Sequence, residues 1–278
     1  MISVLMPVFN GLPLLKASIE SLKRQTNKSW ECIVVDDGST DGTSEYLDSL
    51  NDARFVIHHF EKNQGRPIAR QKTLELAKGD FITMLDAEDL YASNTLDILL
   101  NKMQEYPEVS LVSSSMCSFG TTTDLVRKRG VRREMVVAFD GRHFPNHASS
   151  MMRTVRAKQF QYNPLMKLGQ DRDFLEKYLK GTSFLEIPDI LYFYSEFDSV
   201  SKRKIKRTYR LNIKKSFYSQ NFGQFISFLF KYVAAVFIFP FLSKEQIIRN
   251  RGVELTPLEK ERYVRECKTL VDNILLRK

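Results

Sequence analysis

The stretch FITMLDAEDLY, residues 81–91, joins an apolar run to three carboxylates within four residues. The run over 81–85 has the length and composition of a buried β-strand. Carboxylates at the mouth of such a strand repel one another, and burying them is costly unless a cation compensates their charge. Asp and Glu also suit a solvated turn that begins a helix, which is the simpler interpretation. Which interpretation holds depends on the residues that the fold brings beside these acids.

The first hundred residues alternate between short apolar runs and helical patterns. Strand–helix alternation of this kind predicts an α/β fold with a mainly parallel sheet, whose ligands bind at the carboxyl ends of the strands. Three of those ends, Pro7–Asn10, Asp36–Asp37 and Asp86–Asp89, are therefore expected on one rim, and two of them are acidic. The predicted strands are 2–6, 32–35, 55–58 and 81–85, and the predicted helices are 15–22, 43–50 and 67–77.

Two acidic strand ends on one rim favour a bound divalent metal. Carboxylate oxygens suit Mg²⁺ or Mn²⁺, and such ions usually bind through one or two carboxylates together with substrate phosphates. This pattern indicates a nucleotide diphosphate as partner. The chain has no GxxxxGK[ST] loop and no GxGxxG turn opening a helix, which argues against a P-loop protein and a dinucleotide-binding fold. A sugar-nucleotide site requires such a metal-bridged diphosphate without a phosphate loop.

Five segments of the chain carry motifs that occur together in one enzyme family. They are SVLMPVFNGLPLLKASIESLKRQTNKSWECIVVDDGSTDGT at 3–43, NQGRPIARQKTLELAKGDFITMLDAEDLY at 63–91, HASSMMR at 147–153, LGQDRDFLEKYL at 168–179 and, more weakly, YFYSEFDSVS at 192–201. In order and spacing they resemble the family-two glycosyltransferases, which have the GT-A fold, an α/β domain around a mainly parallel sheet. The resemblance implies a catalytic domain over 1–200, with a nucleotide-binding half at about 1–100 and an acceptor half at about 101–200.

The resemblance assigns the nucleotide to the first two strand ends. By their positions in the family's motifs, Pro7, Val8 and Asn10 would lie against the base and the ribose. Asp37 would accept a hydrogen bond from the uracil ring or its ribose, and Asp36 is expected to brace the turn.

The resemblance also gives roles to the residues of the segment 63–91. Arg70 would face the nucleotide from its helix, with a solvated surface arginine as the alternative. Asp86 and Glu88 would form the family's Asp-x-Asp pair, with Asp86 towards the ribose and the metal and Glu88 on the metal, expected to be Mn²⁺ or Mg²⁺. The family usually has Asp at the second position, and the extra methylene of Glu88 would change the metal geometry or the metal chosen. Asp89 is expected to cap the following helix.

Inversion in one displacement requires a base that removes the acceptor hydroxyl's proton. The resemblance assigns this role to Asp171, which matches the second acid of the family's Glu-Asp pair, although an Asp in a first helical turn is commonly an N-cap. Gln170 stands where the family has Glu, which leaves one fewer negative charge beside Asp171 and favours its ionised form. Asp173 is expected to be structural, and Gly169 to free the chain before the helix.

Two other segments bear on the acceptor and the diphosphate. His147 lies in the stretch that lines the acceptor side in relatives, with a packed or solvated histidine as the alternative. Relatives often have an Arg and a His where this chain has Ser195 and Phe197, neither of which offers a cation or a metal ligand. Stabilisation of the diphosphate would then come from the metal alone or from Lys202 and Arg203.

The C-terminal region, 201–278, is strongly basic. It holds 18 Lys and Arg against 6 Asp and Glu, so the formal net charge of +9 arises there and residues 1–200 are slightly acidic. The stretch KRKIKRTYRLNIKK, 202–215, contains eight basic residues and no acid. The following FGQFISFLFKYVAAVFIFPFL, 222–242, is apolar, but a lysine at a bilayer centre costs roughly 2.5–3.5 kcal/mol and Lys231 lies near its middle. A membrane span is therefore not predicted.

A basic stretch followed by an apolar, aromatic-rich helix fits a helix lying in the interface of an anionic membrane. Contact with a membrane surface through 202–242 is therefore expected, with a buried intramolecular helix or a dimer surface as alternatives. Nucleic acid is not expected as a partner, because the apolar segment follows the basic one. Residues 254–278 have helical apolar spacing, so the whole of 201–278 is predicted to be a helical extension.

The sequence thus predicts an inverting, metal-dependent glycosyltransferase that moves a sugar from a nucleotide-sugar, expected to carry UDP, to a saccharide or lipid-linked acceptor. Surface polysaccharide or glycolipid synthesis at the inner face of the cell membrane is the expected setting. Three distant cysteines and the lack of a basic, apolar leader favour a cytoplasmic protein. A nucleotidyltransferase, the first alternative, would need a basic glycine-rich loop that PVFNGLP at 7–13 does not supply. The second alternative is a catalytically weakened, membrane-bound partner of another transferase, suggested by Glu88 and Ser195.

Overall fold

The computed structural model describes residues 1–120, 123–124, 126–166, 168–196, 202–218, 222–243, 246–247 and 252–275. Contacts between residues divide the chain into two units. The first unit contains Met1–Cys117, Lys128–Tyr194 and Leu255–Lys278, and the second contains Ser118–Arg127 and Ser195–Glu254.

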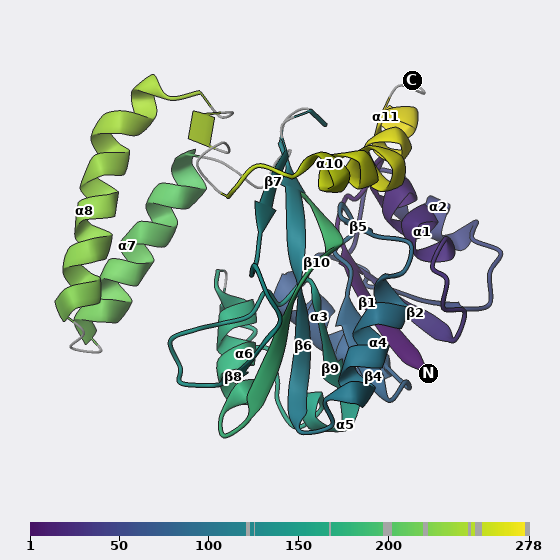
Figure 1. Cartoon of the computed structure of the whole chain (residues 1–278). Coiled ribbons are helices and arrows are strands. Elements are labelled where there is room, and N and C mark those ends of the chain that lie inside the picture. Colours follow the sequence, from purple (N-terminus) through teal and green to yellow (C-terminus); the bar gives the residue numbers. More distant parts are fainter. Residues whose placement is uncertain are drawn as a thin grey trace. The chain divides into compact units, whose positions relative to one another are not determined.

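The first four strands alternate with helices, as predicted (Figure 1). β1 (Ile2–Val8), β2 (Trp30–Asp36), β3 (Phe55–His59) and β4 (Phe81–Met84) lie parallel in the order β3-β2-β1-β4. Their connections contain α1 (Leu15–Lys23), α2 (Thr43–Asp48) and α3 (Arg66–Leu76). Every residue of β1 and β2 is buried, which is typical of parallel strands covered on both faces.

β1 extends two residues beyond the strand predicted at 2–6, so the predicted end of that strand before Pro7 is wrong. Pro7 and Val8 continue the parallel register with β2 as far as Asp36. On its other side, β1 is paired with β4 only as far as Leu5, opposite Met84. Proline has no backbone N–H, and a strand tolerates it where one edge is unpaired. The end of β1 therefore extends beyond β4, beside the acidic residues that follow β4.

The second half of the sheet is antiparallel, so the sheet is mixed rather than mainly parallel. β9 runs antiparallel to β4 and β6, and β10 runs antiparallel to β5 and β8. Antiparallel neighbours need no crossover helix between them, so the alternation in 1–100 carried no information about this half. From β4 the order continues through β9 (Ser150–Arg153), β6 (Val109–Phe119), β10 (Ser183–Ser195) and β5 (Leu90–Tyr91), with β7 (Val126–Arg129) beside β6 and β8 (Met135–Ala138) beside β10.

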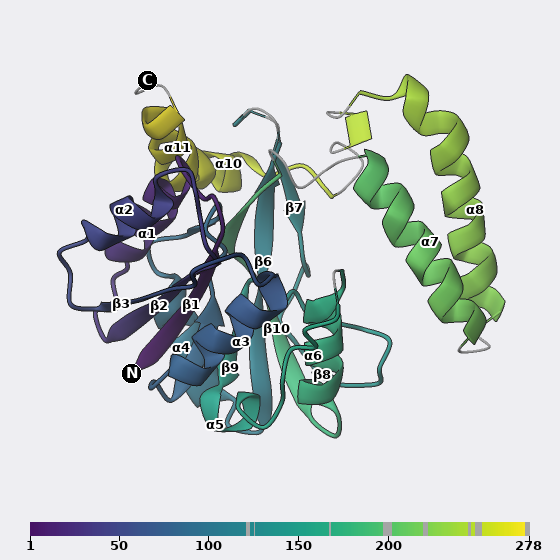
Figure 2. The same ribbon diagram turned by 180° about the vertical axis from the view of Figure 1, so that it is seen from behind.

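Two helices cover the same face of the sheet and position the residues at the strand ends. Figure 2 shows α3 and α6 (Gln170–Leu179) on that face, whereas α4 (Thr95–Glu105) lies in front in the opposite view, Figure 1. The short α5 (Thr154–Ala157) follows β9. Apolar side chains from β1, β2, β4, α3 and α6 share one buried cluster, which includes Leu5, Ile33, Val35, Leu74, Ile82, Met84, Phe174 and Tyr178.

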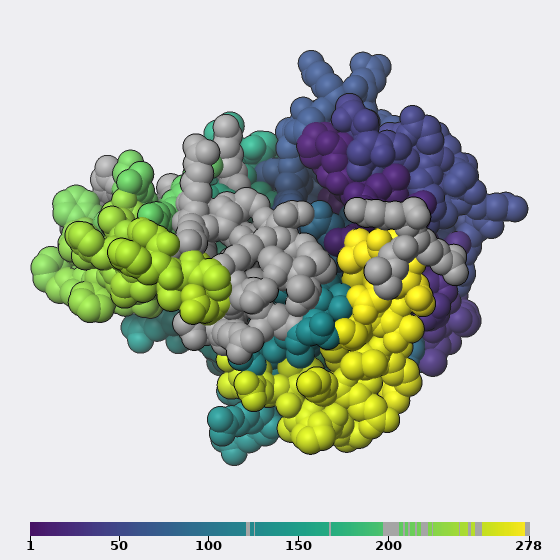
Figure 3. Space-filling model, turned by 90° about the horizontal axis from the view of Figure 1, so that it is seen from above, coloured from purple at the N-terminus to yellow at the C-terminus, as the bar shows by residue number. Residues whose placement is uncertain are grey.

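The last described residues belong to the first unit and pack there against the segment before α4, which locates the helix predicted at 254–278. A capping box between Thr256 and Glu259 begins α10 (Pro257–Tyr263), and a π-helical turn over Val264–Lys268 leads into α11 (Thr269–Leu275). Glu266 Oε2 accepts a hydrogen bond from the Ser93 backbone N–H at 2.9 Å, and Arg262 donates to Asn94 Oδ1 at 2.6 Å. Figure 3 shows these yellow helices lying against purple N-terminal residues.

The second unit contains two helices that pack on each other, α7 (Lys202–Tyr218) and α8 (Phe222–Ile238), followed by a short 3₁₀ turn (Phe239–Phe241). Arg210 Nε on α7 donates to Tyr232 Oη on α8 at 2.6 Å, and Ala235 is buried. No helix within the described ranges is both long and apolar enough to cross a membrane.

Candidate active site

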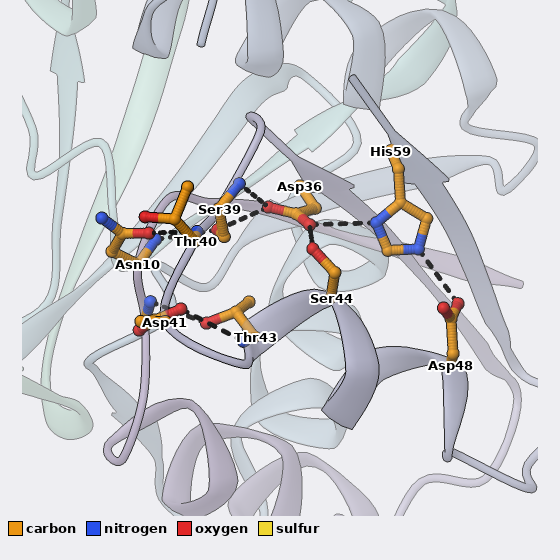
Figure 4. Close-up of polar contacts among 10 residues, drawn as sticks. Asn10, Asp36, Ser39, Thr40, Asp41, Thr43, Ser44, Asp48 and His59 are labelled. Carbon is orange, nitrogen blue, oxygen red and sulfur yellow. Dashed lines mark hydrogen bonds and ion pairs between the residues drawn. The ribbon is translucent and has the colours of Figure 1, made fainter. Parts of the chain in front are cut away.

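The first two strand ends are fastened to each other by hydrogen bonds across their loops (Figure 4). Asn10, which follows β1, has a positive φ of 52°, a conformation that Asn tolerates better than most residues. Its backbone N–H donates to Ser39 Oγ at 2.8 Å, and its Oδ1 accepts from the Thr40 N–H at 2.8 Å. The Leu12 N–H donates to Asp41 Oδ2 at 3.1 Å. The loops after β1 and β2 therefore form one connected rim, as the sequence predicted.

Asp36 braces the turn after β2, as expected. Its buried carboxylate accepts hydrogen bonds from Ser39 and Ser44 and lies 2.9 Å from His59 Nδ1 on β3, as Figure 4 shows. Burial raises the pKa of Asp36, but these hydrogen bonds outweigh it and leave the pKa lowered. The second ring nitrogen of His59 lies 3.1 Å from Asp48 Oδ1. Burial lowers the pKa of His59, and the two carboxylates outweigh that effect and raise it.

Asp37 joins the rim to the start of α3. Its two carboxylate oxygens accept the backbone N–H groups of Gln64 at 2.7 Å and Gly65 at 2.9 Å. Gly65 has a φ of 99°, which the turn into α3 requires and which side chains disfavour. Each carboxylate oxygen can accept a further hydrogen bond. The role of Asp37 towards the uracil ring or ribose stays a prediction.

Arg70 links two acids that are far apart in the sequence. Only 2% of the residue is exposed, so the alternative of a solvated surface arginine is wrong. Its Nη2 donates to both oxygens of Asp86, at 3.1 and 3.2 Å, and its Nη1 forms an ion pair with Asp171 Oδ1. Burial raises the pKa of Asp86, but the charge of Arg70 outweighs it and lowers the pKa. The structure thus brings together Asp86 of the first half and Asp171 of the second.

The acidic segment after β4 passes directly to β5, and this places it beside β10. Tyr192 Oη on β10 accepts from the Asp86 N–H at 3.2 Å and donates to Asp89 Oδ2 at 2.7 Å. Asp89 is buried and precedes a strand, so the expectation that it caps a helix is wrong; Asn94 is the N-cap of the next helix. Glu88, by contrast, is exposed.

Asp171 lies in the first turn of α6, with Gly169 as the N-cap residue at a φ of 75°. Its Oδ1 is buried against Arg70, whereas 43% of the side chain is exposed. Asp173 pairs with Lys177 Nζ one turn further on, at 2.6 Å, which is the structural role expected for it. One carboxylate of this turn therefore belongs to the cluster at the strand ends, and the other belongs to the helix surface.

His147 lies in the same cluster, in the segment before β9. It is 7% exposed and packs edge-on against the rings of Tyr162 and Phe174, so the alternative of a solvated histidine is wrong, and its role on the acceptor side stays a prediction. Its Nε2 lies 3.0 Å from Tyr162 Oη, and its Nδ1 lies 3.9 Å from Asp171 Oδ1. Burial and the charge of Arg70 lower the pKa of His147 to about 3, which keeps the imidazole neutral.

Two tyrosines of the site were missed by sequence reasoning. Tyr192 falls inside the segment 192–201 that resembles the family, so its position held a signal. Tyr162 lies between motifs, and nothing in the sequence marks it. Phe197 lies outside the described residues, and Ser195 is buried. Lys202 and Arg203 begin α7, and their role towards the diphosphate stays a prediction.

The carboxylates after β4 fit a metal that is shared with a substrate. In the part of the chain that the structure describes, no three His, Cys, Asp or Glu residues gather to enclose a metal ion. Asp86 and Glu88 supply two carboxylates, one at a quarter exposure and one exposed. Mg²⁺ and Mn²⁺ commonly bind through one or two carboxylates and complete their coordination with phosphate and water oxygens. The residues present therefore suit such an ion with a diphosphate.

This mixed sheet, with an acidic segment after its fourth strand and flanking helices, is the GT-A fold of glycosyltransferases. Within that class, the chain belongs to glycosyl transferase family 2, whose model matches residues 3–169.

Relatives share part of their length with this chain. A glycosyltransferase assigned to teichuronic acid biosynthesis in Bacillus subtilis is 35% identical over 107 residues, which cover 38% of this chain and 42% of the relative. A UDP-Glc:α-D-GlcNAc-diphosphoundecaprenol β-1,3-glucosyltransferase of Escherichia coli is 34% identical over 103 residues, 37% of this chain and 41% of the relative. The matched region therefore spans about two fifths of each of these relatives.

Solved structures with the same fold cover nearly the whole chain. TarS of S. aureus in complex with UDP has a TM-score of 0.61 at 17% identity, and the match covers 100% of this chain and 92% of that one. A mannosyltransferase from Pyrobaculum calidifontis in complex with GDP-Man and Mn²⁺ has a TM-score of 0.58 at 14% identity, covering 99% and 84%. At these identities the likeness concerns the fold.

Proposed function

We propose that this protein transfers a sugar, with inversion, from a UDP-sugar to a saccharide or lipid-linked acceptor in the synthesis of a surface polysaccharide or glycolipid. The observation that carries the proposal is the cluster in which Arg70 holds Asp86 and Asp171. Asp86 follows a parallel strand at the rim where such sheets bind ligands. Asp171 comes from helix α6, and its carboxylate is partly exposed, with Oδ1 buried against Arg70 and 43% of the side chain exposed. One cluster thus combines a donor-side acid and a candidate base.

The nucleotide is proposed to bind on the rim formed by β1, β2 and β4. Pro7, Val8 and Asn10 would contact the base and ribose, and Asp37 would accept from the uracil ring or ribose. Residues 1–100 would therefore be the nucleotide-binding half and 101–200 the acceptor half of a catalytic domain. TarS has been solved with UDP and with UDP-GlcNAc, and the related mannosyltransferase fold with GDP-Man, which supports a nucleotide at this rim.

Asp86 and Glu88 are proposed to hold a Mn²⁺ or Mg²⁺ ion together with the diphosphate. The Pyrobaculum calidifontis mannosyltransferase was solved with Mn²⁺, which supports the choice of metal. A divalent ion so held supplies electrostatic stabilisation of the charge on a departing diphosphate. Arg70 keeps Asp86 ionised, and the hydrogen bond from the Asp86 N–H to Tyr192 Oη fixes the backbone of the segment.

Asp171 is proposed as the general base. Arg70 holds its Oδ1 and 43% of the side chain is exposed, so the carboxylate can take the proton of an acceptor hydroxyl as the hydroxyl oxygen attacks the anomeric carbon. The helix N-terminus and Arg70 both favour the ionised carboxylate, which a base must be before it acts. His147 would lie on the acceptor side of this carboxylate.

The acceptor is proposed to be a saccharide or a lipid-linked saccharide, and the names of three relatives support this class. One relative is assigned to teichuronic acid biosynthesis, another to colanic acid biosynthesis, and a third acts on a diphosphoundecaprenol-linked sugar. These names support a saccharide or lipid-linked acceptor for this chain.

The second unit is proposed to lie on an anionic membrane, which would place the protein at the inner, cytoplasmic face of the cell membrane. Apolar residues recur on α8 and the turn after it at intervals of three or four, and each is between 43% and 86% exposed. At 100° per residue they form one stripe, whereas Lys231 lies off it and Ala235 faces away from it. Arg207, Arg210 and Lys214 are exposed on α7 and supply positive charge. The stripe residues are Phe222, Ile226, Phe230, Val233, Phe237 and Phe241.

The proposed reaction is tested by two matched carboxylate variants. The purified protein is incubated with UDP-sugars and Mn²⁺, and both hydrolysis of the donor and transfer to lipid-linked saccharides are measured. Asp171→Asn should retain UDP binding and reduce transfer by about 10² to 10⁴, the usual contribution of a general base. Asp173→Asn, on the same helical turn, should transfer normally. Loss of transfer in Asp173→Asn with normal transfer in Asp171→Asn would show that the wrong carboxylate was chosen.

A further inference from the structure

His147 has a buried ring nitrogen that lacks a hydrogen-bond partner among the described residues. Its Nε2 lies 3.0 Å from Tyr162 Oη, so one side of the imidazole is held. Its Nδ1 is fully buried and makes no hydrogen bond, and it lies 3.9 Å from Asp171 Oδ1. Buried polar side-chain atoms nearly always have a partner, so an unpaired nitrogen beside the candidate base calls for a physical explanation.

We propose that His147 and Tyr162 are positioning residues for Asp171, an inference that rests on the proposed transfer reaction. Tyr162 Oη donates to Nε2 of the imidazole, and the ring hydrogen is therefore on Nδ1. The Nδ1–H group donates to Asp171 Oδ1 once their separation falls from 3.9 Å to about 3 Å. Hydrogen bonds between catalytic groups are often long before a substrate binds and tighten in the complex.

The direction of these hydrogen bonds follows from the chemistry of the three groups. Burial, then the charge of Arg70, makes His147 a neutral imidazole at pH 7, with one ring hydrogen. Burial raises the pKa of Tyr162, so its phenol keeps its hydrogen and can donate it. An ionised carboxylate only accepts, so the tautomer with Nδ1–H is the one that can bond to Asp171.

The arrangement decides which oxygen of Asp171 meets the acceptor. Arg70 Nη1 and His147 Nδ1 approach the same oxygen, Oδ1, which is buried. Because 43% of the side chain remains exposed, Oδ2 is the oxygen left for a hydroxyl. Other charged or titratable groups face the cluster from neighbouring elements, and they are Arg66 on α3, Asp86 after β4 and Tyr192 on β10.

In the transfer step the acceptor O–H bond breaks and its proton passes to Asp171 Oδ2. The acceptor oxygen forms a bond to the anomeric carbon of the sugar, and the bond from that carbon to the diphosphate oxygen breaks, with its electron pair leaving on the nucleotide diphosphate. His147 neither gains nor loses a proton in this step. It limits rotation of the carboxylate and stabilises its charged form.

Two amide substitutions separate positioning from packing. In His147→Asn the amide nitrogen can occupy the place of Nδ1, which retains a donor towards Asp171. In His147→Gln the amide reaches the place of Nε2, which retains the contact with Tyr162 but offers no donor at Nδ1. The pKa of Asp171 is measured from its carboxyl ¹³C resonance in metal-free buffer, with the signal assigned by its loss in Asp171→Asn. This measurement requires neither the sugar donor nor the sugar acceptor of the transfer reaction.

The expected result is an Asp171 pKa about one unit higher in His147→Gln, since a hydrogen bond to the charged form is lost. His147→Asn should stay close to the wild type. Tyr162→Phe removes the hydrogen bond that fixes the ring hydrogen of His147 on Nδ1. It should therefore raise the pKa of Asp171 by less than His147→Gln does. His143→Gln is the matched control, because this half-exposed histidine pairs with Glu186 instead.

Transfer kinetics give a second readout for the same variants. In His147→Gln, kcat should fall about tenfold, with little change in the KM for the donor, and the acid limb of the pH profile should move to higher pH. An unchanged Asp171 pKa in His147→Gln, or equal effects of Asn and Gln, would overturn the inference. If the wild type transfers no sugar, the proposed function fails, and the carboxyl titration still decides whether His147 acts on Asp171.

Discussion

Replacing Arg70 by Met removes a buried cation from between Asp86 and Asp171 while keeping much of the side-chain volume. Its Nη2 lies 3.1 Å from Asp86 Oδ1, and at an effective dielectric constant of 20 that pair attracts by about 5 kcal/mol. A quarter of the Asp86 side chain is exposed, which reduces the net value. Breaking a buried pair typically costs 3–5 kcal/mol, so we expect Arg70→Met to lower the free energy of unfolding by about 3 kcal/mol at pH 7.

This loss should depend on pH with a definite sign. In the wild type the pKa of Asp86 is lowered, so the pair's stabilisation is complete above the unfolded pKa of about 3.9 and is lost as the pH falls through the folded pKa. In Arg70→Met, burial is still the largest influence on Asp86 and raises its pKa, and the charge of Arg66 opposes it with less effect. Protonation of Asp86 at low pH should therefore relieve the cost of its unpaired charge. The difference in free energy of unfolding between the wild type and Arg70→Met should therefore be largest at pH 7 and become smaller towards pH 4.

Urea unfolding in buffer with a chelator measures this difference, and the fluorescence of Trp30 monitors the unfolding. This is the one tryptophan of the chain and it is buried in β2, so its signal reports on the sheet. The double variant Arg70→Met/Asp86→Asn should recover most of the stability lost in Arg70→Met, because the charge of Asp86 is removed together with its partner and 43% of the Asp171 side chain is open to solvent. An equal loss at pH 7 and pH 4, with no recovery in the double variant, would show that Arg70 acts only through packing.

Three further predictions concern the metal, the membrane and the braced turn. Glu88→Ala should weaken UDP binding in the presence of Mn²⁺ by at least about tenfold, as measured by calorimetry. The free energy of unfolding should stay unchanged, because the residue is exposed. UDP binding that neither the substitution nor a chelator affects would contradict the metal assignment. Phe230→Ser/Phe237→Ser should lower the affinity for phosphatidylglycerol vesicles, measured by cosedimentation, by roughly 100-fold, because about 3 kcal/mol of apolar burial is lost. The control Val155→Ser/Leu165→Ser changes exposed positions of the first unit and should bind the vesicles as the wild type does. His59→Gln should lower the free energy of unfolding more at pH 5.5 than at pH 8.5, because a raised pKa gives stability that is present below the unfolded value and lost as the pH rises through the folded value. A loss of stability that is independent of pH would remove the proposed charge pairing.

The sequence determined the elements whose signals are local. The runs at 32–35, 55–58 and 81–85 became β2, β3 and β4, and the predicted helices became α1, α2 and α3. These patterns record which side chains each element buries, and burial of apolar area is the dominant stabilising term, so a single strand or helix can be predicted from its own residues. Because parallel strands end on a common rim, the meeting of the first strand ends could also be inferred, and Asp36 could be assigned to its turn.

Contacts between distant residues depend on strand order and helix packing, which the local sequence patterns do not contain. The pairing of β5 with β10 put Tyr192 on Asp89, where a local rule for helix caps had failed. The packing of α3 and α6 on one face of the sheet buried Arg70 between Asp86 and Asp171. An arginine carries the same sequence signal whether it is solvated or ion-paired, because its partners lie on elements whose neighbours are fixed by strand order and helix packing. The hydrophobic pattern of a helix or strand indicates that one of its faces is buried. Which residues cover that face is determined by how the elements pack in the folded chain.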